Sequence, residues 1–374
     1  MKKEIVKYFL VAGLALLTAC SSNDDFLKEN LDGKIFPESF YHNKDELEMA
    51  NNAIYNWINR SFHSYYTTMM IGFFAADDVT TPYSGNTSFV LYDTFIPQAA
   101  DIEGLQGGWE KAYLVINAAN GVIENYKRAE GAVGETELHY YAGQAYFARA
   151  YMYYWLVRCF NEIPYITTAR VPDRTIVPLQ PAELYTHIIE DLQIAEEWLP
   201  QTWNGIDALK HSGGAFTKGA AKATLASVYL TMAGYPVKKT ECYALAAAKA
   251  KELIDNESSY GYRLLDHYAE LWKSTPLICD EDIFVVLYNK NNNYTCCAPK
   301  ACRPIQFGGW EQYTPEINFF NRFPAGERFD ATFVTEFPLN SGFYTESPVL
   351  PWPEGKPMVK WQDMMFGHPY YYKM

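Results

Sequence analysis

The sequence predicts a mostly α-helical fold in which six helices pair as consecutive antiparallel hairpins, as in tetratricopeptide-type stacks. Three observations predict it. Hydrophobic residues make up 49% of the 374 residues, enough for a large core. Apolar residues recur every three or four positions in six separate segments. Finally, only one short apolar run, Ile283–Tyr288, has the character of a buried strand, and few other strands are expected.

The N-terminus carries an export signal. Lysines precede a short apolar run, Tyr8–Leu17, and small residues then lead to Cys20. This order is typical of a bacterial lipoprotein signal, and an ordinary secretory signal is the alternative. We therefore expect residues 1–19 to be removed and Cys20 to carry acyl chains, palmitate among them. Residues 20–42 would form a tether, and the lipid would be the only membrane anchor.

Helical periodicity begins near Asn43, where Asn43 and Glu46 form a plausible capping pair. A second helix is predicted over Leu105–Arg128. The connection between these two helices, residues 73–106, is long and contains acidic residues, glycine and proline. Long ordered loops are more often functional than accidental, so this loop is the first candidate for a binding segment.

Four further helices follow. The third is apolar nearly all round, which places it inside the bundle. Its single central cation, Arg149, must then find a carboxylate or carbonyl partner. Prolines begin and end the fourth helix, and an Asp-Asn pair follows the sixth. The predicted ranges are Glu135–Phe160, Pro181–Leu199, Thr217–Ala233 and Glu241–Ile254.

The chain divides by composition into a helical repeat domain, residues 43–299, and a loop-rich, aromatic-rich region, residues 300–374. In the second region only Thr314–Phe323 is predicted to be helical. The helical repeat domain also contains two cysteines within its predicted helices. Cys159 and Cys242 lie in apolar helical stretches and are predicted to be buried thiols.

Near the boundary between these regions, cysteines cluster in a loop. In an exported protein, Cys296, Cys297 and Cys302 could supply a structural disulfide. The pairing among these three and Cys279 stays open. Their spacing matches no zinc pattern, so no metal site is expected.

Charge and motifs exclude several functions. The formal net charge of −13 argues against nucleic acid or an anionic membrane surface as the main partner. The usual nucleophile, zinc-protease and nucleotide-binding motifs are absent, and the seven histidines are scattered. We therefore expect no catalytic residues, no cofactor and no enzymatic activity.

Five stretches in the expected order resemble the SusD/RagB family of outer-membrane lipoproteins. They are NDDFL at 23–27, Ala142–Thr167, Leu184–Pro200, Gly213–Leu230, and YRLLDHYAELW at 262–272 followed by DEDIFVVLY at 280–288. The resemblance implies a surface-exposed, lipid-anchored protein of the outer membrane. Such a protein would bind oligosaccharide and deliver it to a SusC-like TonB-dependent transporter, over which it would sit as a lid.

The resemblance also implies where the glycan would bind, because the family builds its glycan surface from the loop between the first two helices and from loops beyond the strand. Sugar sites combine flat aromatic rings with nearby carboxylate and amide groups. The corresponding residues here are Asp77, Asp78, Tyr83, Asn86, Phe89, Tyr92, Trp310, Gln312 and Tyr313, with Trp352 and Trp361 as weaker candidates.

Two alternatives stay open at this point: a RagB-like, peptide-binding protein of the same architecture, and a helical glycoside hydrolase. The chain also departs from the family pattern. The glycine that usually follows the long helix is replaced within Cys159–Glu162, and members usually continue beyond the equivalent of Tyr370 into another helix. We therefore expect a C-terminally truncated or short variant, since helix Thr314–Phe323 has no obvious partner after it.

Overall fold

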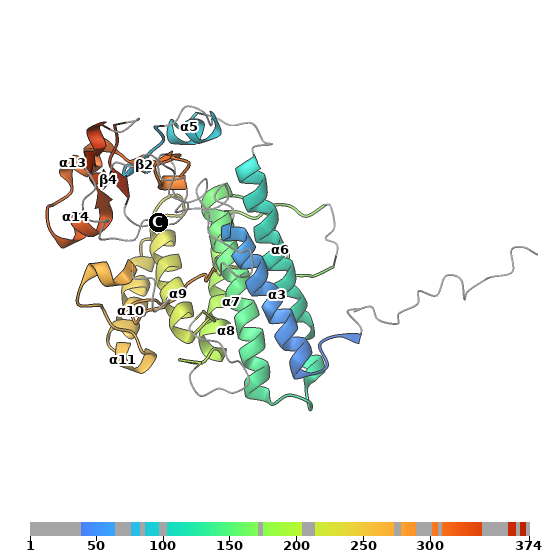
Figure 1. The fold of residues 1–374 in the computed structure, drawn as a ribbon. Helices are drawn as coiled ribbons and strands as arrows, with labels where there is room; N and C mark the ends of the chain where they lie inside the picture. Colours follow the sequence, from blue (N-terminus) through green and yellow to red (C-terminus); the bar gives the residue numbers. More distant parts are fainter. Residues whose placement is uncertain are drawn as a thin grey trace, which may run out of the picture. The chain divides into compact units, whose positions relative to one another are not determined.

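The computed structural model confirms the mostly helical class, with helices that follow one another as hairpins (Figure 1). The long helices are α3 Lys44–His63, α6 Glu103–Asn125, α7 Glu135–Phe160, α8 Pro181–Trp198, α9 Lys218–Ala233 and α10 Cys242–Ile254. The structure describes residues 39–63, 76–82, 87–96, 103–170, 175–203, 214–272, 278–288, 301–305, 309–338, 358–363 and 367–371. The predicted signal, Cys20 and the first part of the tether lie outside these ranges.

Local sequence explains where the helices begin. The Asn43 side chain accepts a hydrogen bond from the Glu46 backbone N–H (3.0 Å), and the Glu46 carboxylate accepts one from the His42 backbone N–H (2.7 Å). This reciprocal pair satisfies N–H groups that the first turn of a helix leaves open, as predicted. At α9, the Thr217 hydroxyl accepts from the Ala220 backbone N–H (3.1 Å) and acts in the same way.

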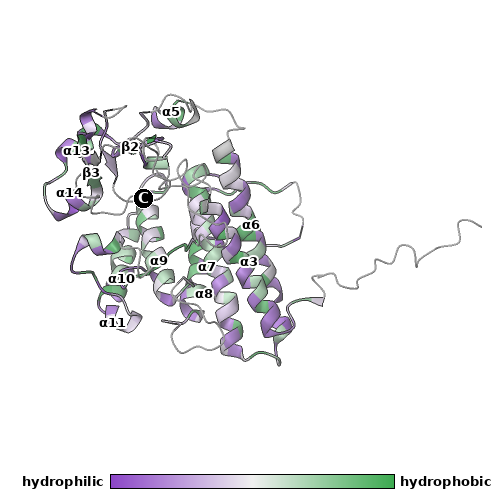
Figure 2. Cartoon of the chain, in the orientation of Figure 1, coloured by the Kyte–Doolittle hydropathy of each residue, from purple (hydrophilic) through white to green (hydrophobic). Residues whose placement is uncertain are grey.

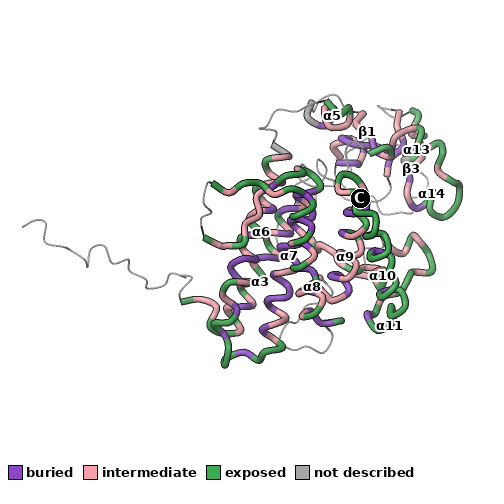
Figure 3. Tube along the Cα trace, turned by 180° about the vertical axis from the view of Figure 1, so that it is seen from behind, coloured by how far each residue is buried: buried purple, intermediate pink, exposed green. Residues whose placement is uncertain are grey.

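Each long helix packs against the next one along the chain, which gives the hairpin pairs α3/α6, α7/α8 and α9/α10. Hydrophilic and hydrophobic residues alternate along α3 and α6 (Figure 2), as expected of helices that cover a core with one face. By contrast, α7 is buried along most of its length (Figure 3). The prediction that the third helix lies inside the bundle is therefore confirmed.

Residues 41–374 form one compact unit, so the helical and aromatic-rich regions share a single body. Three two-stranded antiparallel sheets occur among the described residues: β1 pairs with β2, β3 with β6, and β4 with β5. Their strands are β1 Val79–Thr80, β2 Thr314–Pro315, β3 Phe333–Val334, β4 Glu336–Pro338, β5 Met358–Lys360 and β6 Tyr370–Tyr371. The short helices are α5 Thr87–Asp93, α11 Glu257–Tyr260, α13 Ile317–Arg322 and α14 Glu327–Thr332, and the 3₁₀ turns are η2 Tyr126–Ala129, η3 Tyr268–Trp272 and η6 Trp361–Asp363.

Three sequence predictions need correction. Residues 283–288 form no strand: Asn59 Nδ2 donates to the Leu287 carbonyl oxygen (2.7 Å), and Phe284 and Val286 pack against the helical core. Because helices rather than a neighbouring strand cover this apolar run, it stays irregular. The helix predicted at 314–323 is shorter, since Thr314–Pro315 pairs in β2 before α13 begins, and it is not the only helix of this region, because α14 follows it.

The third correction concerns the two predicted buried thiols. Cys242 is buried at the start of α10, but Cys159 is exposed near the end of α7, where that helix leaves the core. Cys302 is buried, and its predicted disulfide partners Cys296 and Cys297 lie outside the described residues. The disulfide therefore stays a prediction.

Candidate functional site

The predicted binding loop folds into a short strand and a short helix that are tied together. The Asp93 carboxylate, at the end of α5, accepts from the Thr80 hydroxyl (3.0 Å) and from the Thr81 backbone N–H (3.2 Å). Hydrogen bonds to a charged acceptor are stronger than neutral ones. Asp93 therefore holds the end of α5 against β1.

The two segments predicted to form the site come together in the structure. β1 and β2 pair antiparallel, with Val79 opposite Pro315 and Thr80 opposite Thr314. The Asp78 carbonyl oxygen also accepts from the Glu316 backbone N–H (2.8 Å) and from the Tyr371 hydroxyl (2.7 Å). Loops that are more than 200 residues apart in the sequence thus form one surface, which we call the β1–β2 surface.

The exposure of the predicted residues divides them into two groups. Asp77 is exposed, and Asp78, Tyr92 and Trp310 are partly exposed. Phe89 and Tyr313 are fully buried and Gln312 is 9% exposed. In this structure, neither of the two buried rings has a face open to a ligand, so we leave both out of the proposed contact surface. Tyr83, Asn86 and Trp352 lie outside the described residues, and Trp361 packs edge-on against Phe320 (5.7 Å between centroids).

Sequence reasoning missed Phe95, directly after α5. Its side chain is 77% exposed and that of the neighbouring Ile96 is 49% exposed. Phe95 also has a positive φ of 55°, which is unusual for a bulky residue. An exposed aromatic residue held in this way is a candidate contact for a ligand. The available sequence signal was the apolar pair Phe95-Ile96 directly in front of Pro97.

A buried acid lies beside Trp310. Glu311 is 0% exposed, and its Oε2 accepts from the Ile305 backbone N–H (3.2 Å). Within the described part of the chain, its Oε1 accepts no hydrogen bond. Burial raises the pKa of this carboxyl to about 7, and the Ile305 bond opposes that rise. Glu311 is therefore a buried carboxyl, next to Trp310 in the sequence, whose pKa is raised toward neutral pH by burial.

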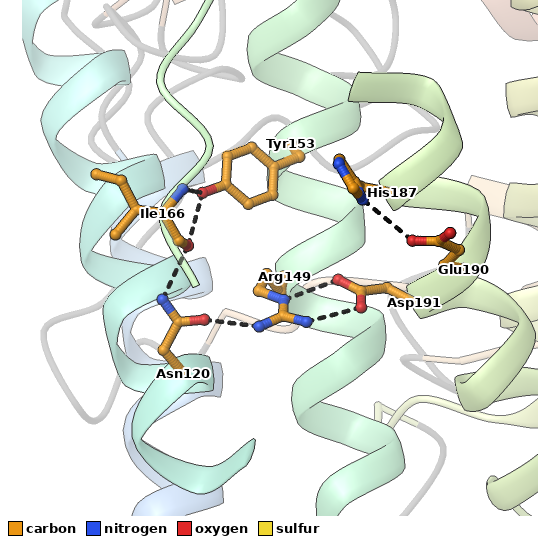
Figure 4. Close-up of polar contacts among 7 residues, drawn as sticks. All are labelled: Asn120, Arg149, Tyr153, Ile166, His187, Glu190 and Asp191. Atoms are coloured by element: carbon orange, nitrogen blue, oxygen red, sulfur yellow. Dashed lines mark hydrogen bonds and ion pairs between the residues drawn. The ribbon is translucent and has the colours of Figure 1, made fainter. Parts of the chain in front are cut away.

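A second buried polar cluster lies inside the helical bundle (Figure 4). Arg149 on α7 donates to both carboxylate oxygens of Asp191 on α8 (2.7 Å each) and to Asn120 Oδ1 on α6 (2.9 Å). Asn120 in turn donates to the Ile166 carbonyl oxygen (3.0 Å), which also accepts from the Tyr153 hydroxyl (2.9 Å). The predicted partner for Arg149 is thus found.

This cluster joins three helices and the segment after α7, and its polar groups satisfy one another. On the neighbouring surface, His187 pairs with Glu190 (3.0 Å) and its ring stacks on Tyr165 (centroids 4.4 Å apart). Because Arg149 and Asp191 are only 7% and 6% exposed, we interpret the cluster as structural. It keeps the bundle rigid beneath the loops.

The described residues offer little support for a metal or a membrane span. Across the described ranges, no group of three or more His, Cys, Asp or Glu side chains is placed to hold a metal ion. No helix within these ranges is long and apolar enough to cross a bilayer.

Comparison with known proteins identifies the class. A SusD-like family model, described as "Starch-binding associating with outer membrane", matches residues 76–230. SusD-like protein P2 from Formosa agariphila is 32% identical over 295 residues, which are 75% of this chain and 53% of that protein. The chain belongs to the SusD-like family.

Solved structures agree on the fold. A SusD superfamily protein from Parabacteroides distasonis superposes with a TM-score of 0.70 at 21% identity, over 88% of this chain and 69% of that one. A laminarin-binding SusD-like protein superposes with a TM-score of 0.66 at 22% identity, over 78% of this chain and 66% of that one. The chain spans only about half the length of the curated relative P2.

Proposed function

We propose that this chain binds a neutral oligosaccharide on the β1–β2 surface without cleaving it. The observation that supports the proposal is the pairing of β1 with β2, which joins the segment of Asp77 to the segment that follows Trp310. The Asp93 carboxylate in turn ties the end of α5, two residues before the exposed Phe95, to β1. A solved relative with the same fold is a laminarin-binding protein, which supports a sugar as the ligand.

The chemistry of these side chains suits a sugar. Aromatic rings such as Trp310 and Phe95 can pack against the apolar C–H faces of a sugar ring, each contributing roughly 0.5–1.5 kcal/mol by analogy with aromatic pairs. The carboxylates of Asp77 and Asp78 can accept hydrogen bonds from hydroxyl groups. Because a few such contacts give only modest affinity, many copies at a cell surface would add avidity.

The same proposal includes the cellular setting. Cys20, after a basic and apolar leader, would carry the lipid that anchors the protein in the outer membrane. A SusC-like TonB-dependent transporter would receive the bound glycan. The lipoprotein reading makes a simple prediction about mass: the mature protein would begin at Cys20 and carry fatty acid.

Isothermal titration calorimetry tests the binding proposal. The full chain is titrated with laminari-, malto-, cello- and xylo-oligosaccharides and with a mixed peptide pool. We expect heat of binding with at least one glycan, and an affinity about tenfold lower for Trp310→Ala and for Phe95→Ala. Tyr243→Ala is the matched control, since Tyr243 is a 51% exposed aromatic residue on α10, outside this surface.

The other outcomes separate the alternatives. Heat with the peptide pool alone would favour a peptide-binding protein of the same architecture. Release of reducing sugar from a bound glycan, lost in Asp77→Asn or Asp78→Asn, would indicate a hydrolase. Glycan binding that neither ring substitution weakens would place the site elsewhere on the molecule.

A further inference from the structure

An aromatic stack lies where α6 ends, α7 begins and α8 ends. Trp198, the last residue of α8, and His139 in α7 lie parallel, with centroids 4.3 Å apart and an interplanar angle of 5°. Tyr146 meets the Trp198 ring edge-on at 5.7 Å, and Tyr126 lies 6.1 Å away. The rings of the stack thus come from η2, α7 and α8.

Two cavities share this stack as a common wall, and we call them the Trp198 cavities. One, of about 410 Å³, is also lined by Glu197, Gln201 and Lys218. The other, of about 550 Å³, is also lined by Tyr126, Lys127 and Glu130. Both volumes fall in the range of small-ligand sites. Neither cavity uses a residue of the β1–β2 surface.

The polar side chains that line these cavities are available to a ligand. Glu130, Glu197, Gln201 and Lys218 form no side-chain hydrogen bond or ion pair with another described residue. The adjacent Glu196 differs, because its carboxylate is bonded by Lys222 and Lys249. Two consecutive acids on α8 thus have different environments: one closes a salt-bridge network, and the other lies at a cavity.

The charges at the cavities indicate what kind of ligand they fit. Glu197 is matched by Lys218 in one cavity, whereas Glu130 and Glu135 accompany Lys127 in the other, which therefore carries one excess negative charge. Neither cavity therefore favours a strongly charged ligand. Donors and acceptors around an aromatic wall suit an uncharged molecule with an apolar ring face and many hydroxyl groups.

From this arrangement we propose that the Trp198 cavities form a second carbohydrate site, separate from the β1–β2 surface. A sugar ring packs against the Trp198–His139 wall and exchanges hydrogen bonds with Glu197 and Lys218 on one side or with Glu130 and Lys127 on the other. Two sites on one chain would hold a long polysaccharide at two points, which raises its effective concentration at each site.

Fluorine NMR on the full chain labelled with fluorotryptophan tests this site directly. Trp198→Phe and Trp310→Phe assign the two resonances that report on the two sites. Laminari-, malto-, cello- and xylohexaose are the probes. We expect at least one of them to shift the Trp198 resonance, and the shift to persist in Trp310→Phe.

A double substitution provides the second measurement. Glu130→Gln with Glu197→Gln removes two exposed carboxylates that have no partner among the described side chains, so folding should be unchanged. It should raise the apparent Kd reported by the Trp198 resonance about tenfold. Glu241→Gln with Glu257→Gln, two exposed acids away from the cavities, is the control and should leave that Kd unchanged.

The possible results separate this proposal from the proposed function. A Trp198 resonance that no hexaose shifts, or a shift that the double substitution leaves unchanged, overturns the second site. If only the Trp310 resonance moves, the β1–β2 surface stands and the second site falls. If only the Trp198 resonance moves, the second site stands and the β1–β2 surface falls.

Discussion

The helical bundle and the region after residue 300 are stabilised in different ways. In the bundle, long helices bury regular apolar faces, and ionic contacts join them. The buried cluster around Arg149 joins α6, α7 and α8, and Glu196 joins α8 to Lys222 on α9 and Lys249 on α10. After residue 300, the strands are two or three residues long, and aromatic rings fill the space between them. Helices with a regular apolar face need few polar contacts to join them. Short irregular segments depend instead on large side chains that pack together from several directions.

Phe333 is the centre of this second region. Its ring contacts Phe320 (5.0 Å between centroids), Phe329 (5.2 Å) and Tyr371 (5.7 Å), and it is only 4% exposed. These contacts join α13, α14 and β6. The β1–β2 surface lies at the junction of the two regions, so both kinds of stabilisation bear on it.

Loss of Arg149 should give the largest effect. Arg149→Ala leaves the Asp191 carboxylate buried without its partner, and we expect a loss of about 3–5 kcal/mol in the free energy of unfolding. Urea unfolding followed by circular dichroism measures it. The double variant Arg149→Met with Asp191→Leu should recover most of that loss, since no unpaired charge remains. If the double variant is as unstable as the single one, the cluster does more than balance its own charges.

Truncation of Phe333 should give the next largest effect. Phe333→Ala removes a ring that packs against several others, and we expect about 3 kcal/mol of destabilisation. Hydrogen exchange should quicken most in residues 314–338 and 358–371, and less in α7. Phe329→Leu, which keeps an apolar side chain, is the milder control. If hydrogen exchange becomes faster to the same extent in both regions, they unfold as one unit and are not stabilised in different ways.

The smallest expected effect on stability comes from Glu311, at the junction of the helical bundle and the region after residue 300. The unfolded carboxyl titrates near pH 4.5, and burial raises the pKa in the folded protein to about 7. The folded state thus binds the proton more tightly, so stability falls as pH rises from about 4.5 to about 7. The loss should be on the order of 2 kcal/mol.

Thermal melts of the native protein and of Glu311→Gln at pH 5 and pH 8 measure this loss of stability. The native protein should lose more stability between the two pH values than the variant. Glu316→Gln is the matched control, because its carboxylate caps α13 near the surface. Parallel pH dependences of the native protein and Glu311→Gln would show that Glu311 is not the group responsible.

Much of the fold could be predicted from the sequence. Helix α7 has the predicted bounds, and α8 and α10 differ from their predictions by one residue at one end, because prolines and a regular apolar pattern define them. The run at 283–288 shows the limit: apolar residues alone do not say whether a strand or a helix face will cover them.

The candidate site was less predictable, and Phe89 and Phe95 show why. Both belong to one short stretch, yet Phe89 is 0% exposed and Phe95 is 77% exposed. A helix of seven residues is too short for its pattern to identify the buried face. The cover over Phe89 depends on distant contacts. The Trp198 cavities were missed for the same reason, since their wall and polar groups come from η2, α7, α8, the start of α9 and the loops between them.

The hydrogen bonding of the Asp78 carbonyl oxygen bears on the order in which parts of this chain can fold. It accepts a hydrogen bond from the Tyr371 hydroxyl, 293 residues further on, and a protein chain is synthesised from its N-terminus. Helical hairpins can fold as they emerge, because their contacts are local. The ligand surface proposed at β1 must instead wait until residue 371 has been made, so the helical scaffold would form before the proposed binding surface.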